Sequence, residues 1–429
     1  MRNILMIVLG TILISLYYFP VTFAIFPIMN SKNLMAGVGI LVAVWELLQR
    51  RSSILDRNIF IIMIFAILVS LTGLFSVVYN ETPDYTYASY IKSFFIWLLS
   101  ANVVVSSIRR MYGYVSVALI SNFLIIMCVA QCMIALLVDT YPIIKNWVDA
   151  NFIGMSYYGE HERLYGLGAA LDVAGGKFAA VLLMIAFFIN KNKNNLKTKW
   201  MFFYVISFLF ILIVGSMIGR TTTVGGILAI LYLIWVNRFK LFNTNNRKLL
   251  LIFSSFIAVG IFVSFYLYQK NPAFKENIRF AFEGFFNWWE IGEWKTNSTN
   301  RWKTMFIWPD NIKTWIIGDG YFNGPSEIDP NYVGPTNYGY YKWTDIGYLR
   351  FIFYFGLIGL FLFILYFCKV AMACMRRFPM NRMLFLFLLM LNFIIWCKVA
   401  TDIFLVFALF LCIHETENEE YENLLKQIQ

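Results

Sequence analysis

Long apolar runs, separated by short polar segments, follow one another along almost the whole chain of 429 residues. Runs of about 17 to 25 residues are long enough to cross a bilayer as α-helices. The pattern therefore predicts an all-α polytopic membrane protein with about twelve transmembrane helices. Eleven is the alternative, because Lys398 and Asp402 interrupt the last run. The expected spans are approximately residues 3–28, 33–49, 58–78, 91–108, 112–138, 174–190, 200–218, 222–236, 249–268, 346–368, 383–398 and 400–413.

The composition agrees with this class, because 60% of the residues are hydrophobic and only 14% are charged. A soluble domain cannot bury so much apolar surface. In a soluble protein the net charge of +11 would suggest nucleic acid as a partner. Here the basic residues gather in every second short loop, an asymmetry that marks the cytoplasmic side of a membrane. We therefore expect the lipid bilayer and no nucleic acid as a partner, with both termini in the cytoplasm.

The spans divide the chain into six parts. The first span lacks a signal-peptide cleavage site, and we therefore expect the mature protein to retain it. The two longer outer loops are rich in Trp and Tyr, which favour the headgroup region. The expected parts are helices 1–5 in residues 1–138, the first outer (periplasmic) loop in 139–173, helices 6–9 in 174–268, the large outer loop in 269–344, helices 10–12 in 345–413 and a cytoplasmic tail in 414–429.

The large outer loop is predicted to contain short interfacial helices. Apolar residues recur there at helical spacing with charged residues between them, as in a helix that lies on a membrane. These residues are Phe274, Ile278, Phe282, Phe285 and Trp289. Ser298-Thr299-Asn300 predicts the cap of a second helix that begins at Arg301, and Pro309 predicts its end. Gly318-Asp319-Gly320 predicts a turn.

Arg220 is the sharpest candidate for chemistry. It lies in a connection of a few residues between two apolar runs, GSMIGRTTTVGG, where a cation is costly unless it meets a polar cavity or an anion. A guanidinium suits phosphate because its planar fork donates two hydrogen bonds and keeps its charge. The alternative is an arginine that reaches the lipid headgroups and binds no substrate.

Two further arginines in the outer loops are candidate phosphate ligands. Arg163 precedes a glycine-containing segment that ends in Gly175-Gly176, whose backbone can bring N–H groups close to an anion. The alternative is an ordinary surface arginine. Arg301, at the predicted start of a helix, would share the first turn with backbone N–H donors. His161, close to Arg163, can titrate near neutrality and is a reserve candidate for a general base.

Asp345 and Arg350 open the tenth span. Asp345 stands at a predicted N-cap position, and it is either a cap or a general base that takes a proton from a nucleophilic hydroxyl. Arg350, inside the helix, needs an anionic partner, either a substrate or an acid of another helix. Lys398 and Asp402, four residues apart on a predicted helix, are expected to pair with each other.

Cysteine and histidine usage gives no reason to expect a metal centre. The six cysteines lie in or beside apolar runs, and the chain has only two histidines. We therefore expect no disulfide framework, no metal site and no cofactor.

Four short motifs, taken in their order and spacing over residues 150–370, resemble the O-antigen ligase and polymerase superfamily. They are Arg301-Trp302, Ile317-Gly318-Asp319-Gly320-Tyr321-Phe322, Asp345-Ile346-Gly347-Tyr348 and Phe355-Gly356-Leu357-Ile358-Gly359-Leu360, and the stretch GRTTTVGGILAIL is similar to the family's basic motif before a span.

Departures from the family's patterns favour one branch of it. The ligases have a histidine in the polar motif of the long loop, whereas this chain has none between residues 162 and 413 and has Asp345 in a comparable place. This difference favours a Wzy-type polysaccharide polymerase. The R-x10-G pattern of those polymerases is not kept after Arg163, because Ala174 precedes Gly175.

The resemblance implies glycosyl transfer at the outer leaflet of a bacterial inner membrane, in O-antigen, lipopolysaccharide or capsule synthesis. A hydroxyl of one repeat unit would attack the anomeric carbon of a chain on undecaprenyl diphosphate, so donor and acceptor are both lipid-linked oligosaccharides. A chain-length regulator is a further partner that the resemblance allows. The four arginines named above would bind the leaving diphosphate without a metal, and Asp345 or His161 would deprotonate the acceptor.

Two alternative functions stay open. One is a ligase that transfers finished polymer from undecaprenyl diphosphate to lipid A core or to a protein. The other is a lipid-linked oligosaccharide flippase, which should place its polar residues at mid-bilayer depth between two similar halves.

Overall fold

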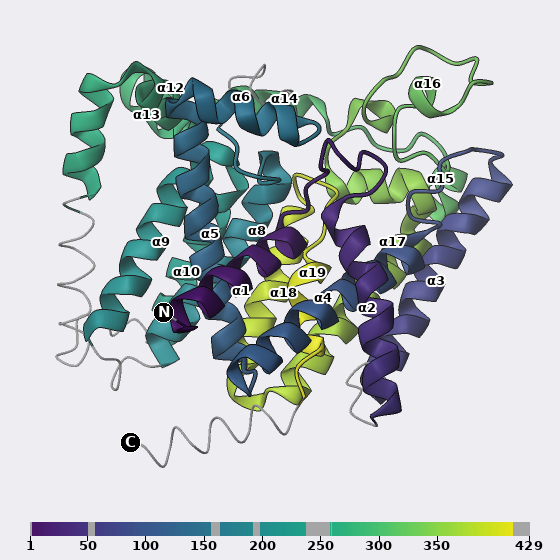
Figure 1. Ribbon diagram of the computed structural model, residues 1–429. Helices are drawn as coiled ribbons and strands as arrows, with labels where there is room; N and C mark the ends of the chain where they lie inside the picture. The colour runs from purple at the N-terminus through teal and green to yellow at the C-terminus, as the bar shows by residue number, and fades with distance from the viewer. Residues whose placement is uncertain are drawn as a thin grey trace. The chain divides into compact units, whose positions relative to one another are not determined.

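A computed structural model describes residues 2–49, 56–155, 164–191, 198–236, 258 and 260–414, and every regular element among them is a helix (Figure 1). Isolated bridges, such as that between Thr22 and Asn30, are the only β pairing in this part of the chain. The helices are α1 (Arg2–Tyr18), α2 (Ser31–Leu48), α3 (Arg57–Tyr79), α4 (Tyr90–Tyr112), α5 (Val117–Thr140), α6 (Pro142–Asn151), α8 (Leu171–Lys191), α9 (Thr198–Ile218), α10 (Thr221–Val236), α12 (Pro272–Ala281), α13 (Glu283–Ile291), α14 (Asn297–Thr304), α15 (Ile312–Ile317), α16 (Pro325–Ile328), η1 (Tyr341–Trp343), α17 (Gly347–Arg377), η2 (Pro379–Asn381), α18 (Arg382–Ile395) and α19 (Phe404–Leu411).

Within the described residues, 7 helices are long and apolar enough to cross a membrane, namely α2, α3, α4, α5, α8, α9 and α17. They suggest a multi-pass membrane protein, but the predicted count of about twelve spans is not confirmed. The apolar helices α1, α10 and α18 are shorter. Of the predicted span 249–268, only residues 258 and 260–268 are described.

Four predicted spans differ from the helices that form. The first was expected to reach residue 28, but α1 ends at Tyr18, two residues before Pro20, which has no N–H group for a helical hydrogen bond. Residues 396–403 are not helical, so α18 and α19 are short, and Lys398 and Asp402 do not lie on a helix as predicted. In contrast, α17 continues to Arg377, well beyond residue 368.

The chain forms two compact units. The first comprises the described residues of 1–35 and 104–294, and the second those of 36–103 and 295–414. The boundary after Trp294 divides the large outer loop, so that α12 and α13 belong to the first unit and α14 to α16 belong to the second.

In the first unit, α8 is the central helix, and almost every residue from Ala174 to Ile189 is buried. It packs closely against α10 because small residues face each other. A Cβ on Gly225 of α10 would approach the backbone of Ala179 on α8 to less than 3.0 Å. Close backbone approach of this kind is how small residues join helices that lack a hydrophobic driving force in lipid.

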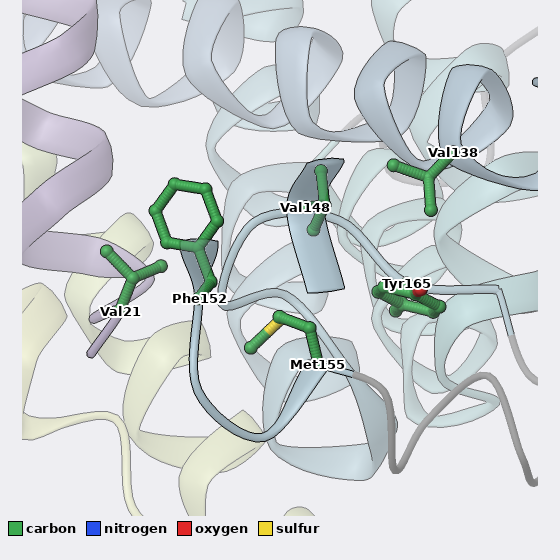
Figure 2. Packing of buried hydrophobic residues seen from close by; sticks show 6 residues of the cluster. All are labelled: Val21, Val138, Val148, Phe152, Met155 and Tyr165. Carbon is green, nitrogen blue, oxygen red and sulfur yellow. The ribbon is translucent and has the colours of Figure 1, made fainter. Parts of the chain in front are cut away.

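The first outer loop is folded onto the helices below it. Figure 2 shows the apolar cluster that joins α6 to the end of α5 and to the segment after α1. Its buried members are Val21, Val138, Val148, Phe152, Met155 and Tyr165. The Tyr165 hydroxyl also donates a hydrogen bond to Asp149 Oδ1 over 2.8 Å. The amphipathic helix α6 therefore uses its apolar face to hold the described part of this loop in place.

The predicted interfacial helix of residues 274–289 is in fact two helices. Asn271 caps α12 through a bond from the Phe274 N–H, and Pro272 occupies the first turn, as its fixed φ favours. At Phe282 the backbone leaves the helical region, with φ −117° and ψ 27°. The apolar spacing therefore located the segment correctly but did not reveal the break.

In the second unit, α17 packs against α3, α15 and α18, and its buried face is largely aromatic. The ring centroids of Phe351 and Trp396 are 4.9 Å apart, and those of Phe363 and Trp396 are 5.0 Å apart. The helix is interrupted at Phe355 and at Gly356, where φ is +68°. Part of the large outer loop lies against this interruption.

Candidate functional site

Arg220 lies in a very tight turn between α9 and α10, in the first unit. Gly219 and Arg220 alone separate the two helices. A Cβ on Gly219 would come closer than 3.0 Å to the backbone oxygen of Leu171, at the start of α8. The turn can therefore lie directly on α8 only because residue 219 is glycine.

Two helix N-termini meet beside this turn. The helix α10 begins at Thr221, and α8 begins at Leu171. The Thr221 hydroxyl donates to Asp172 Oδ1 over 2.9 Å, and a Cβ on Gly175 would lie 3.0 Å from Gly219 O. Helix N-termini carry partial positive charge and exposed N–H donors. The surroundings of Arg220 therefore favour an anion.

The Arg220 side chain is held from the side of α12 and α13. Its Nη2 donates to Glu283 Oε2 over 2.6 Å, and the two side chains are only 16% and 21% exposed. The guanidinium carbon lies 4.1 Å from the centroid of the Phe280 ring. Glu283 and Phe280 therefore hold the Arg220 side chain in place, and its binding of a phosphate stays a prediction.

In the second unit, the Gly318-Asp319-Gly320 turn lies in the interruption of α17. The Asp319 N–H donates to Phe353 O over 2.6 Å, and the Gly320 N–H donates to Tyr354 O over 3.1 Å. These bonds use carbonyl groups that the break in the helix leaves without helical donors. The predicted turn takes the form of a bend at Gly320, and its backbone is fixed to the helix.

Asp345 and Arg350 lie together at the start of α17. The N-cap is Ile346, which makes no side-chain cap bond, so Asp345 precedes the cap position that the sequence suggested for it. Arg350 Nη1 lies 3.8 Å from Asp345 Oδ1, at the outer limit of an ion pair. The Asp345 side chain is 20% exposed, and its Oδ1 atom is buried.

Arg350 itself is enclosed by the outer loop. Its side chain is 5% exposed, and its Nη2 donates to Phe322 O over 2.9 Å. The guanidinium carbon lies 3.5 Å from the Phe322 ring centroid and 4.2 Å from that of Tyr340. These contacts hold residues 322–340 against α17. The binding of a diphosphate by Arg350 stays a prediction.

Asp319 forms a polar cluster to which the sequence analysis gave no role. Its carboxylate accepts from the Thr314 hydroxyl over 2.6 Å and from the Tyr341 hydroxyl over 3.2 Å, and Lys313 Nζ lies 3.0 Å away. Burial, followed by the charge of Asp319, raises the pKa of Tyr341 well above its usual range. The sequence feature that could have revealed this cluster is an acidic residue between two glycines, Gly318-Asp319-Gly320.

Arg301 does not stand where the sequence placed it. The helix α14 begins at Asn297, and Thr296 caps it by accepting from the Thr299 N–H over 2.8 Å. Arg301 is therefore exposed in the last turn, and the predicted anion cradle at a helix start is wrong. His161 and Arg163 lie outside the described residues.

The structure therefore brings together one predicted pair, Asp345 and Arg350. Arg220 belongs to the first unit, whereas Arg301 belongs to the second with that pair, and convergence of the arginines on one substrate stays a prediction. Among the described residues, no three His, Cys, Asp or Glu side chains gather as metal ligands would. Comparisons with known protein families, curated proteins and solved structures found no match.

Proposed function

We propose that this protein is a glycosyltransferase of the Wzy type, which joins oligosaccharide repeat units carried on undecaprenyl diphosphate. In this proposal it acts at the outer leaflet of a bacterial inner membrane, with both termini in the cytoplasm. It takes a lipid-linked donor and a lipid-linked acceptor. The resemblance of four motifs suggests this reaction, and the apolar helices agree with a protein that works in a membrane.

The observation that carries the proposal is the environment of Arg220. A partly buried guanidinium belongs to the turn at which the N-termini of α8 and α10 meet. Its positive charge and the N–H donors of the helix ends together match a diphosphate. The Glu283 carboxylate, 2.6 Å from Arg220, would be displaced when a diphosphate enters.

The proposed reaction is a substitution at the anomeric carbon of the donor. The acceptor hydroxyl oxygen forms a bond to this carbon, and the bond from the carbon to the diphosphate oxygen breaks with its electron pair. Arg220 stabilises the charge that develops on the diphosphate. The hydroxyl proton passes to a carboxylate, for which we propose Asp345, with His161 in reserve.

Within this scheme, Arg350 would position Asp345. It is fixed by Phe322 and Tyr340 and keeps its charge 3.8 Å from the Asp345 carboxylate. A nearby cation keeps a carboxylate ionised and therefore able to accept a proton.

The two alternatives make different products. A ligase would transfer finished polymer to lipid A core or to a protein, and a flippase would carry lipid-linked oligosaccharide across the membrane. The polar residues of the Arg220 turn lie at the ends of helices, whereas the transporter alternative calls for polar residues at the middle of the spans. This placement favours the enzyme.

The test is the surface polysaccharide of a deletion strain that carries the wild type, Arg220→Ala, Asp345→Asn or the control Lys303→Ala. Lys303 is an exposed residue of α14, so its variant should restore the full ladder of polymer lengths. We expect Arg220→Ala and Asp345→Asn, at equal membrane levels, to leave single repeat units.

Three outcomes would contradict the polymerase. Long polymer retained on undecaprenyl diphosphate in the deletion strain would indicate a ligase. A lack of outer-leaflet repeat units would indicate a flippase. A full ladder with both variants would show that neither residue takes part in the reaction.

A further inference from the structure

The first unit contains an apolar cavity that the proposed reaction does not use. Its volume is about 450 Å³, and it lies between α9, the helical residues 260–270, and α12 and α13. Leu209, Ile213, Phe265, Ile278, Phe282 and Phe286 supply most of the wall. Ser264 and Tyr268 add the only hydroxyls among the lining residues.

The cavity is open along part of its surface, and an apolar wall of this kind does not hold ordered water. Buried water needs two to four polar partners, and even an engineered apolar cavity of about 150 Å³ binds apolar molecules. The wall here offers hydrocarbon and aromatic surface, and its volume falls in the range of sites that hold small ligands. For a chain that lies in a bilayer, a lipid chain is the apolar molecule at hand.

The charges beside the cavity select the headgroup of that lipid. Tyr268, in the wall, accepts a hydrogen bond from Arg279 Nη1 over 2.9 Å, and Lys275 Nζ lies 5.3 Å from its ring centroid. Glu290 pairs with Arg279 through two bonds of 2.8 and 2.7 Å, which balances one of the two positive charges. The positive charge of Lys275 at this edge favours a negative headgroup.

We propose that this cavity binds one chain of an anionic phospholipid, such as phosphatidylglycerol, whose phosphate lies at Lys275 and Arg279. The inference is independent of the proposed glycosyl transfer. It names a lipid of the surrounding bilayer, distinct from the lipid carrier of the substrate.

Gly260 allows a sharp test. It lines the cavity, and a Cβ built on it would meet nothing within 4 Å. Gly260→Leu should therefore add a side chain at the cavity wall without a clash and narrow the cavity, while improving the helix propensity of its position. Gly37 of α2 also has open space around a built Cβ, and Gly37→Leu is the matched control.

The experiment measures lipids retained by the purified full-length protein, by native mass spectrometry, after exchange into detergent with phosphatidylglycerol or phosphatidylethanolamine. We expect the wild type and Gly37→Leu to retain phosphatidylglycerol preferentially and Gly260→Leu to lose it while staying folded. Lys275→Gln should weaken phosphatidylglycerol binding about fivefold, from about 1 kcal/mol for one surface cation. Lys303→Gln should leave it unchanged.

Several outcomes would overturn the proposal. Equal retention of both phospholipids would remove the role of Lys275 and Arg279, and unchanged binding by Gly260→Leu would place the lipid elsewhere. A polyprenyl phosphate that displaces phosphatidylglycerol at equal concentration would assign the cavity to the substrate carrier. Retention of no lipid by the folded wild type would show that the cavity is not a lipid site.

Discussion

Gly356 of α17 and Ile316 of α15 meet backbone to backbone. A Cβ on Gly356 would lie closer than 3.0 Å to the carbonyl group of Ile316, and Gly356 has a φ of +68° that other residues rarely adopt. Gly318 has the converse relationship, since its Cβ would lie 2.5 Å from Tyr354 O. Two motifs that stand apart in the sequence are therefore two sides of one contact.

Gly356→Ala should destabilise the protein because it adds both a clash and backbone strain. A residue in an unfavourable φ region costs about 1–3 kcal/mol, and the contact with Ile316 adds to it. The measurement is thermal unfolding of the purified protein in detergent. Gly37→Ala is the control and should be neutral or stabilising by up to about 1 kcal/mol. Equal melting temperatures for both variants would argue against the contact.

Glu283→Gln should strengthen the binding of a soluble diphosphate-linked analogue of the donor. The substitution removes the negative charge that competes at Arg220, a pair that we expect to contribute about 1 kcal/mol, which corresponds to about fivefold in affinity. Arg220→Gln should abolish the binding instead. Titration of both variants at low salt checks this. Weaker binding by Glu283→Gln would mean that Glu283 only positions Arg220.

Asp56 makes stability depend on pH at the start of α3. Burial raises the pKa of its carboxyl, but the Asn58 N–H and the Arg377 guanidinium outweigh this, and the pKa lies below 3.8. The folded protein then binds fewer protons than the unfolded chain, so stability increases with pH through this range. The contribution is complete above pH 3.8 and is lost as the pH falls through the folded pKa.

Asp56→Asn should therefore lower the melting temperature near pH 6, and its difference from the wild type should shrink as the pH falls below 3.8. Solvent screening limits the effect to about 1 kcal/mol at most. The exposed Asp310 gives the control variant Asp310→Asn, which should behave as the wild type. If the melting temperatures of Asp56→Asn and the wild type differ by the same amount at low pH, the Asp56 charge is not the source of that difference.

Arg350→Lys should loosen the outer loop although it keeps the charge. A lysine cannot reproduce the planar stacking between Phe322 and Tyr340, and we expect a loss of about 2 kcal/mol. Faster cleavage by trypsin after Lys342 would report it. The control is Arg301→Lys, at an exposed position. Normal resistance to trypsin with lost activity would assign Arg350 to the substrate.

The sequence was sufficient for the class of fold and for local turns. Apolar length and composition predicted a helical membrane protein. The glycines around Asp319 predicted a change of chain direction, and both have positive φ, because local conformational preference depends on neighbouring residues. The hydrophobic pattern is a poorer guide to the residue at which a helix ends than to the class of fold. The end of α1 before Pro20 was visible in the sequence, but the break after α18 follows from packing around Trp396, whose indole N–H donates to Thr401 O over 2.7 Å.

The sequence by itself determined that the chain is apolar and helical, and it predicted which arginines lie in the outer loops. Only the tertiary structure decided the partner of each arginine, because pairing depends on distances between segments far apart in the chain. Glu283 reaches Arg220 and Phe322 encloses Arg350, and neither contact follows from periodicity or spacing. The division of the large outer loop after Trp294 has the same cause, since compact units are defined by contacts made in space.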